Sequence, residues 1–139
     1  MIVAYALMLP VAAGAQMLPN HRLTPGAVAT ESAGDVCLPY YSSRHVRHVS
    51  TQLKHQVYVE YFGKYRRGYV IDHLVPREIG GADELRNLWP QPRAESTVKD
   101  RIENRARFEV CDEHRPLSDA QHAFMRDWRS ASEWRPHPR

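Results

Sequence analysis

The sequence predicts a small, single-domain α+β protein. Its 139 residues match the usual size of one domain. Two short segments, 69–71 and 87–89, carry the β-branched, aromatic and apolar residues that are typical of strands. The stretch 94–110 contains no Gly or Pro, and its apolar residues recur every four positions, which is typical of a helix. Two strands followed by a helix in one short chain favour the α+β class.

The remaining segments are assigned in the same way. Apolar residues recur at helical spacing from Ser50, and this predicts a short helix that ends at Gly63. The capping-box pattern at Ser118 predicts the start of a further helix that continues to about Ser132. The chain is therefore divided into a probable signal peptide, an N-terminal arm with a short helix, a core of two strands and a helix, and a C-terminal helix with a tail: 1–15, 16–68, 69–111 and 112–139.

The first 15 residues predict a secretory signal peptide. Met1–Ala15 is apolar, although it lacks Lys and Arg, and Ala13-Gly14-Ala15 before Gln16 has the small-x-small form of a cleavage site. The apolar run is shorter than the ~20 residues of a membrane span. We therefore expect an exported protein, periplasmic or secreted, that leaves the membrane after cleavage. The alternative to a signal peptide is a misassigned start of the chain. The sequence does not indicate an oligomeric state.

The two cysteines are expected to form a disulfide bond. Cys37 and Cys111 lie far apart in the sequence, which does not match the CxxC spacing of metal sites. An oxidising compartment would favour their pairing. The alternative is two buried free thiols in a cytosolic protein.

The basic residues suggest a polyanionic partner. Arg accounts for 16 of the 19 basic residues, and the formal net charge is +3. Between Arg44 and Arg67 there are six basic residues, one acidic residue and several aromatic ones. Arg presents a fork of donors that suits phosphate, and aromatic residues among basic ones suit nucleic acid. The alternative is an ordinary solvated basic surface.

One group of polar residues fits hydrolysis of a phosphodiester. Asp72 and His73 are adjacent at the end of the first predicted strand, and Asn87 begins the second. This reaction needs an activated water, a cation near the phosphate and a group that orients the base. His73 is the candidate base and Asn87 the residue that orients it. Asp72 and a helix carboxylate, Glu95 or Asp100, are the candidate ligands of a hard divalent cation.

These residues also resemble a known family. The motifs are Asp72-His73-Leu74-Val75-Pro76, Gly80-Gly81, Asn87-Leu88-Trp89-Pro90-Gln91, and Lys99-Asp100 with Glu103. Together they resemble the HNH nucleases, and in particular small, often exported HNH-like proteins with the pattern DHLVPxELGG…NLWPQ…KDxxEN. The resemblance covers residues 69–111. It implies a ββα-metal finger at the centre of the domain, with additional helices around it, and metal-dependent cleavage of DNA. It also assigns His73 as general base, Asn87 as the middle signature residue and Asp72 as a metal ligand.

The sequence departs from that family at the third signature position. Many members have His or Asn at the start of the helix, whereas this chain has Glu95, followed by Asp100 one turn later. Oxygen ligands favour Mg or Mn, and Zn is the alternative. Arg77, Lys99 and Arg101 flank the site and are expected to contact phosphates, with DNA as the expected partner and RNA left open.

Two other functions stay open. The chain could be a nucleic-acid-binding module that has lost turnover, because its third metal ligand is absent. It could also be an exported interaction protein that is held together by its disulfide. Taken singly, Asp72, His73 and Asn87 are also compatible with roles in turns, caps or the protein core.

Overall fold

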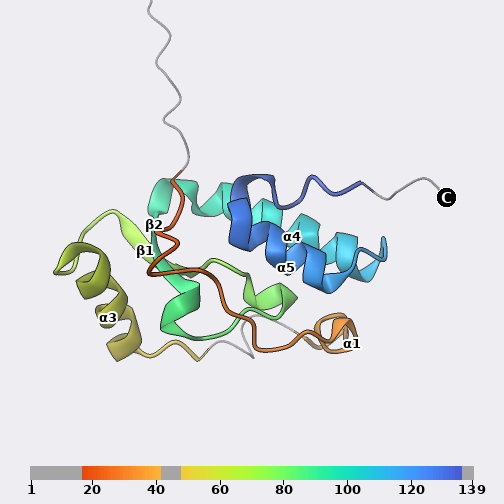
Figure 1. Cartoon of the computed structure of the whole chain (residues 1–139), viewed down its shortest axis with the longest axis horizontal. Helices are drawn as coiled ribbons and strands as arrows, with labels where there is room; N and C mark the ends of the chain where they lie inside the picture. Colours follow the sequence, from red (N-terminus) through yellow and green to blue (C-terminus); the bar gives the residue numbers. More distant parts are fainter. Residues whose placement is uncertain (1–16, 42–47, 136–139) are drawn as a thin grey trace, which may run out of the picture.

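The centre of the fold is a two-stranded antiparallel sheet followed by a long helix (Figure 1). In this computed structural model, β1 spans Tyr69–His73, β2 spans Leu88–Pro92 and α4 spans Ser96–Cys111. The register pairs His73 with Leu88. Helices pack around this unit, so the predicted α+β class is confirmed.

The structure describes residues 17–41 and 48–135. The predicted signal peptide, residues 1–15, therefore lies outside the described residues, as do Arg44 and Arg47 of the basic stretch. Within the two described ranges, no helix is long and apolar enough to cross a membrane.

The second strand starts one residue later and ends three residues later than predicted, so Asn87 lies before it and the strand includes two prolines. Pro90 lies opposite Ile71, and Pro92 lies opposite Tyr69. Arg93 N donates to Gly68 O at the adjacent step of the ladder. In an antiparallel pair the hydrogen-bonded and non-hydrogen-bonded positions alternate, so both prolines occupy positions that donate no hydrogen bond to β1. A two-stranded sheet tolerates proline there, since its outer edges have no partner strand.

The predicted helix from Ser50 to Gly63 is confirmed. It forms α3, Thr51–Phe62, where the Ser50 side chain accepts a hydrogen bond from Leu53 N and Gly63 ends the helix with a φ of 73°. The side chain at the N-terminus satisfies one of the unpaired amides of the first turn. A positive φ at the C-terminus favours glycine. Val57 on this helix is buried, and the helix packs against β2.

Two predicted boundaries were wrong, and one short helix was missed. The helix expected from Ala94 starts two residues later, because 93–95 form a 3-10 turn. Ser118 lies inside α5, Leu117–Asp127, and does not cap it. The helix follows Pro116, whose carbonyl accepts from the amides of the first turn, and proline is well suited to a helix start. The arm predicted as a loop contains a short helix, α1, Ala33–Val36.

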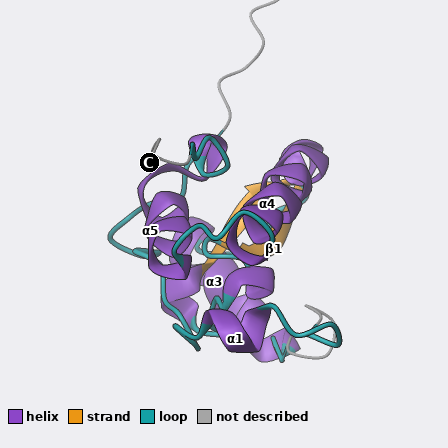
Figure 2. Cartoon of the chain, turned by 90° about the vertical axis from the view of Figure 1, so that its right-hand side faces the viewer, coloured by secondary structure: helices purple, strands orange, loops and turns teal. Residues whose placement is uncertain are grey.

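The core lies among the hairpin, α4 and α5, and Figure 2 shows these helices alongside the sheet. Trp89 is fully buried there, as its apolar setting predicted. The predicted disulfide is present between Cys37 and Cys111, whose Cα atoms are 5.4 Å apart. It connects the segment after α1 to the end of α4. This covalent bond joins the N-terminal arm to the core.

Candidate functional site

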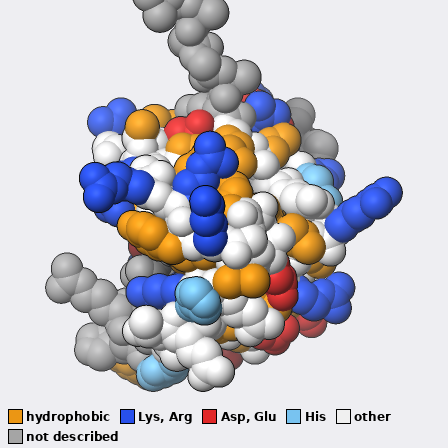
Figure 3. All heavy atoms as spheres, turned by 90° about the vertical axis from the view of Figure 1, so that its left-hand side faces the viewer, with side chains coloured by type: hydrophobic (Ala, Val, Ile, Leu, Met, Phe, Trp, Pro, Cys, Tyr) orange, Lys and Arg blue, Asp and Glu red, His pale blue; other side chains and the backbone are white. Residues whose placement is uncertain are grey.

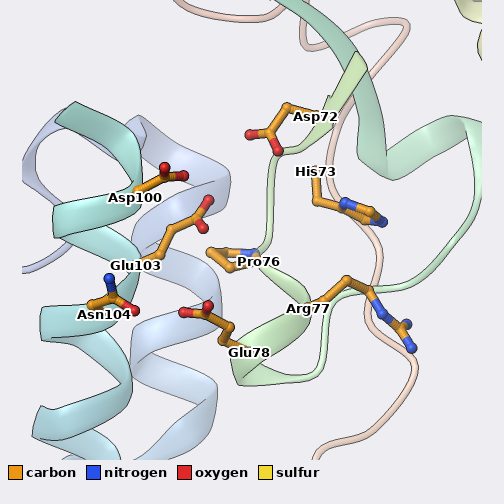
Figure 4. Close-up of a pocket in the computed structure, with 8 residues that line it drawn as sticks. All are labelled: Asp72, His73, Pro76, Arg77, Glu78, Asp100, Glu103 and Asn104. Carbon is orange, nitrogen blue, oxygen red and sulfur yellow. The ribbon is translucent and has the colours of Figure 1, made fainter. Parts of the chain in front are cut away.

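A cavity of about 260 Å³ lies where the end of β1 meets α4 and a 3-10 turn, Arg77–Ile79. It is lined by residues from all three elements (Figure 4): Asp72, His73, Pro76, Arg77, Glu78, Asp100, Glu103 and Asn104. Four of these carry carboxyl groups, and Figure 4 shows those groups turned toward a common space. The predicted residues Asp72, His73 and Asp100 are therefore brought together.

His73 is held by an aspartate that the sequence interpretation missed. Its Nε2 lies 2.8 Å from Oδ1 of Asp83, and the imidazole is buried at the edge of the cavity. Burial opposes ionisation of Asp83, but hydrogen bonds from His73 and from the His48 amide outweigh it and lower the pKa of this carboxyl. Asp83 therefore stays ionised and accepts a hydrogen bond from Nε2–H. An ionised carboxylate fixes both the tautomer and the orientation of a histidine in this way.

Contrary to the expectation from sequence, Asn87 does not orient His73. Its fully buried side chain instead binds the backbone of the connection between the strands. Oδ1 accepts from Val75 N at 2.9 Å, and Nδ2 donates to Val75 O and Ala82 O, each at 3.0 Å. Oδ1 also accepts from Ala27 N in the N-terminal arm. Asn87 is therefore a positioning residue, because these bonds fix the loop that carries Asp83.

Lys99 is not available to phosphate, contrary to the expectation from sequence. It is fully buried, and its ammonium lies behind the cavity. Nζ is 2.7 Å from Asp72 Oδ2, donates to His73 O at 2.7 Å, and also pairs with Glu103. Burial lowers the pKa of Lys99, but the Asp72 and Glu103 carboxylates outweigh it, so the net shift is upward. The ammonium is thus held in its charged form inside the protein.

The three predicted metal ligands are not assembled. Glu95 accepts a hydrogen bond from Met17 N at 2.9 Å and does not line the cavity. The Asp72 carboxylate is paired with Lys99, and Asp100 is exposed at the rim. In the described part of the chain, no three His, Cys, Asp or Glu residues are grouped so that they could hold a metal ion. The residues present therefore do not fit the predicted site of Asp72, Glu95 and Asp100.

Arg77 and Arg101, the other two residues predicted to contact phosphate, differ in accessibility. Arg77 lines the cavity, but its guanidinium bonds to Gly81 O and lies 3.6 Å from Asp83. Figure 4 shows it directed away from the carboxyl groups. Arg101 is exposed on α4, outside the cavity lining. Arg101 is thus accessible, whereas Arg77 helps to fix Asp83 and the loop.

Glu103 is the carboxyl group whose protonation is most affected by this environment. Burial and the charges of Asp72 and Glu78 raise its pKa, while Lys99 lowers it, and the net effect brings the pKa to about 7. The physical cause is that two carboxylates share one ammonium in a poorly solvated place. Glu103 can therefore hold or release a proton near neutral pH.

A basic and aromatic surface lies on the side of the molecule that contains α3. Residues 64–67, Lys-Tyr-Arg-Arg, are all exposed. The Arg66 guanidinium lies 5.1 Å from the centre of the Phe62 ring and 5.4 Å from that of Tyr69. Figure 3 shows Lys and Arg side chains spread over this face, with acidic side chains sparse. Tyr69 begins β1, the strand that ends at His73, so one strand connects this surface to the cavity.

Sequence reasoning missed Asp83 because no spacing relates it to His73, and only the folded loop brings them together. The Lys99–Glu103 pair had a usable signal, since residues four apart on a helix are neighbours. Comparisons of the chain with family models, curated proteins and solved structures find no match.

Proposed function

We propose that the cavity hydrolyses phosphodiester bonds in nucleic acid, with DNA as the expected substrate and RNA left open. The observation that carries this proposal is the His73–Asp83 pair, 2.8 Å apart at the edge of a cavity rich in carboxyl groups. The resemblance of residues 69–111 to HNH nucleases points to the same reaction. The exposed basic surface beside α3 supports nucleic acid as the substrate class.

In this proposal, His73 is the general base. Nε2 keeps its proton and donates a hydrogen bond to Asp83, so the ring lone pair is on Nδ1. Nδ1 is buried in this structure, so the reaction requires a movement that exposes it to the cavity. Nδ1 then takes a proton from a water molecule as that water attacks phosphorus, and the bond from phosphorus to the leaving oxygen breaks. The leaving oxygen then needs a proton. Glu103, with a pKa of about 7, is the candidate donor. Such a reaction usually has one general base and one general acid, whose surroundings give them different pKa values.

Charge is the main physical difficulty for a phosphate in this cavity. Four carboxyl groups face it, whereas Arg77 is directed away and Lys99 is already paired. When bound, a divalent cation such as Mg or Mn would offset the repulsion between these carboxylates and the substrate. This cation is a prediction from the resemblance and the charge balance. No coordination is assigned to it.

Export is part of the same proposal. The Cys37–Cys111 disulfide supports an oxidising compartment, where such bonds persist. Cleavage after Ala15 would leave Gln16 as the first residue.

Plasmid nicking by the purified protein tests the activity. The assay is run in Mg, Mn, Zn and EDTA, and His73→Ala is compared with His55→Ala, which removes an exposed histidine of α3. We expect nicking that falls by about 100-fold or more in His73→Ala and is unchanged in His55→Ala. Equal nicking by the folded His73→Ala variant would exclude His73 as the base.

The second candidate is a nucleic-acid-binding module without turnover. The observation that favours it is the pairing of Asp72, the predicted metal ligand, with Lys99 at 2.7 Å. Such a module would shift DNA on a gel in EDTA and would cut it in none of the metals. A protein that neither binds nor cuts would leave the exported interaction protein as the explanation.

A further inference from the structure

We propose that Lys99 is the resident cation of this site: its ammonium fills a position, built by three oxygen atoms, that would otherwise bind a divalent metal ion. The oxygens belong to the carboxylates of Asp72 and Glu103 and to the backbone carbonyl of His73. This inference concerns the occupant of the position, and it holds whether or not the protein cuts nucleic acid.

The ligand set around Nζ has the chemistry of a hard-cation site. An ammonium has three donors, and Lys99 directs them to three oxygen acceptors. Asp72 Oδ2 and His73 O each lie 2.7 Å from Nζ. Calcium ions bind the same kinds of oxygen at about 2.3–2.6 Å, so small movements would let a metal replace the ammonium. Two carboxylates and a carbonyl suit Mn or Ca better than Zn.

The burial of Lys99 shows that this position is specific for a positive charge. The other two lysines, Lys54 and Lys64, are exposed, whereas Lys99 is fully buried. Burying a lone ammonium is very unfavourable, and it persists only when the charge is paired and hydrogen-bonded. Nζ also lies 5.7 Å from the centre of the Phe124 ring, which closes the position from the side of α5. The surrounding groups thus form a site for one positive charge.

The position of the Lys99 ammonium matters for the cavity because it joins the two elements that carry Asp72 and Glu103, β1 and α4. Asp72 and Glu103 face the cavity from β1 and α4, as Figure 4 shows. The third acceptor is the carbonyl of His73, the proposed base. Lys99 thus fixes the end of β1 against α4, as a metal bridging the same oxygens would. Lys99 therefore excludes a divalent ion from these three oxygens in the native protein.

Mn²⁺ binding tests the inference. The free ion is measured by electron paramagnetic resonance during titration of the wild type and of Lys99→Ala at the same pH. Alanine keeps the helix propensity of α4 while vacating the position. We expect Lys99→Ala to bind one Mn²⁺ at least about tenfold more tightly than the wild type, the scale on which even the outer partners of a metal site change its affinity. Mn²⁺ should also raise the Tm of Lys99→Ala.

Three further variants complete the design. The tighter binding should disappear in Lys99→Ala/Asp72→Asn and in Lys99→Ala/Glu103→Gln. Lys54→Ala, an exposed lysine of α3, should bind Mn²⁺ as the wild type does. The inference is overturned if folded Lys99→Ala gains no affinity, or if the gain survives both double substitutions. If Lys99→Ala does not fold in EDTA, it is refolded with Mn²⁺. Recovery supports the inference, and no recovery overturns it.

Discussion

Nε2 of His73 lies 2.8 Å from Oδ1 of Asp83, a residue in the connection between the two strands. The two residues come together because Asn87 binds the loop backbone at Val75 and Ala82. Arg77 adds a contact to the same carboxylate. The candidate base is therefore positioned by the loop, and the stability of that loop determines its geometry.

Asp83→Asn is expected to lower kcat/KM for DNA nicking by about 10- to 100-fold, the usual effect of removing a carboxylate that orients a histidine. The amide keeps the size of the side chain but no longer requires the proton on Nε2. The matched control is Glu84→Gln, a neighbouring exposed acid that should change little. A wild-type rate in Asp83→Asn would show that the pair has only a structural role.

Gly81→Ala is expected to lower the free energy of unfolding by about 3 kcal/mol or more. A Cβ at this position would lie 1.8 Å from Val75 O, and a backbone atom cannot move away cheaply. Urea unfolding measures the change. Gly34→Ala is the control, since its Cβ would meet only Ser32 Oγ at 3.5 Å. A small loss in Gly81→Ala would mean that the loop backbone can shift.

Glu103 should make stability depend on pH. Its pKa is raised from 4.5 to about 7, so the folded state binds the proton more tightly than the unfolded state does. The resulting stabilisation is complete below about pH 4.5 and is lost as the pH rises through 7, by up to about 3 kcal/mol. Glu103→Gln cannot titrate. The difference in unfolding free energy between wild type and this variant should therefore change across that range, and a constant difference would contradict the raised pKa.

Reduction of Cys37–Cys111 should destabilise the protein by ~3–5 kcal/mol, as expected for a cross-link that closes a long loop. Unfolding with and without dithiothreitol measures this effect, and Cys37→Ser/Cys111→Ser should match the reduced protein.

Mass spectrometry of the exported protein should find Gln16 as its first residue and a mass two hydrogens below that of the dithiol form. An intact Met1 with two thiols would refute the export proposal.

Removal of Arg66 and Arg67 should weaken DNA binding without changing its sequence preference. Each lost phosphate contact should reduce the slope of log K against log salt by about 1. Fluorescence anisotropy at several salt concentrations gives the slope. Arg126→Ala/Arg135→Ala removes two exposed arginines near the C-terminal end of the chain and controls for net charge. Equal effects of the two changes would mean that the surface beside α3 has no special role.

Local rules predicted much of the fold. Ser50 and Gly63 bound α3 because a side-chain cap and a left-handed residue act over one turn. The two strands and α4 follow from residue type and periodicity. The end of β2 could not be predicted in this way. Whether Pro90 is tolerated depends on the register with Ile71, and the register is a property of the pair of strands.

The sequence by itself determined the order of the main elements and the placement of Asp72 and His73 at the end of a strand, and it favoured a disulfide between the two cysteines. Only the tertiary structure decided that Asp83 holds His73, that Asn87 binds the loop, and that Lys99 is buried. The physical reason is that a charged side chain has the same local preferences on the surface and in the core. Its role depends on which opposite charges the fold brings to it, and for Lys99 those are Asp72 on β1 and Glu103 on α4.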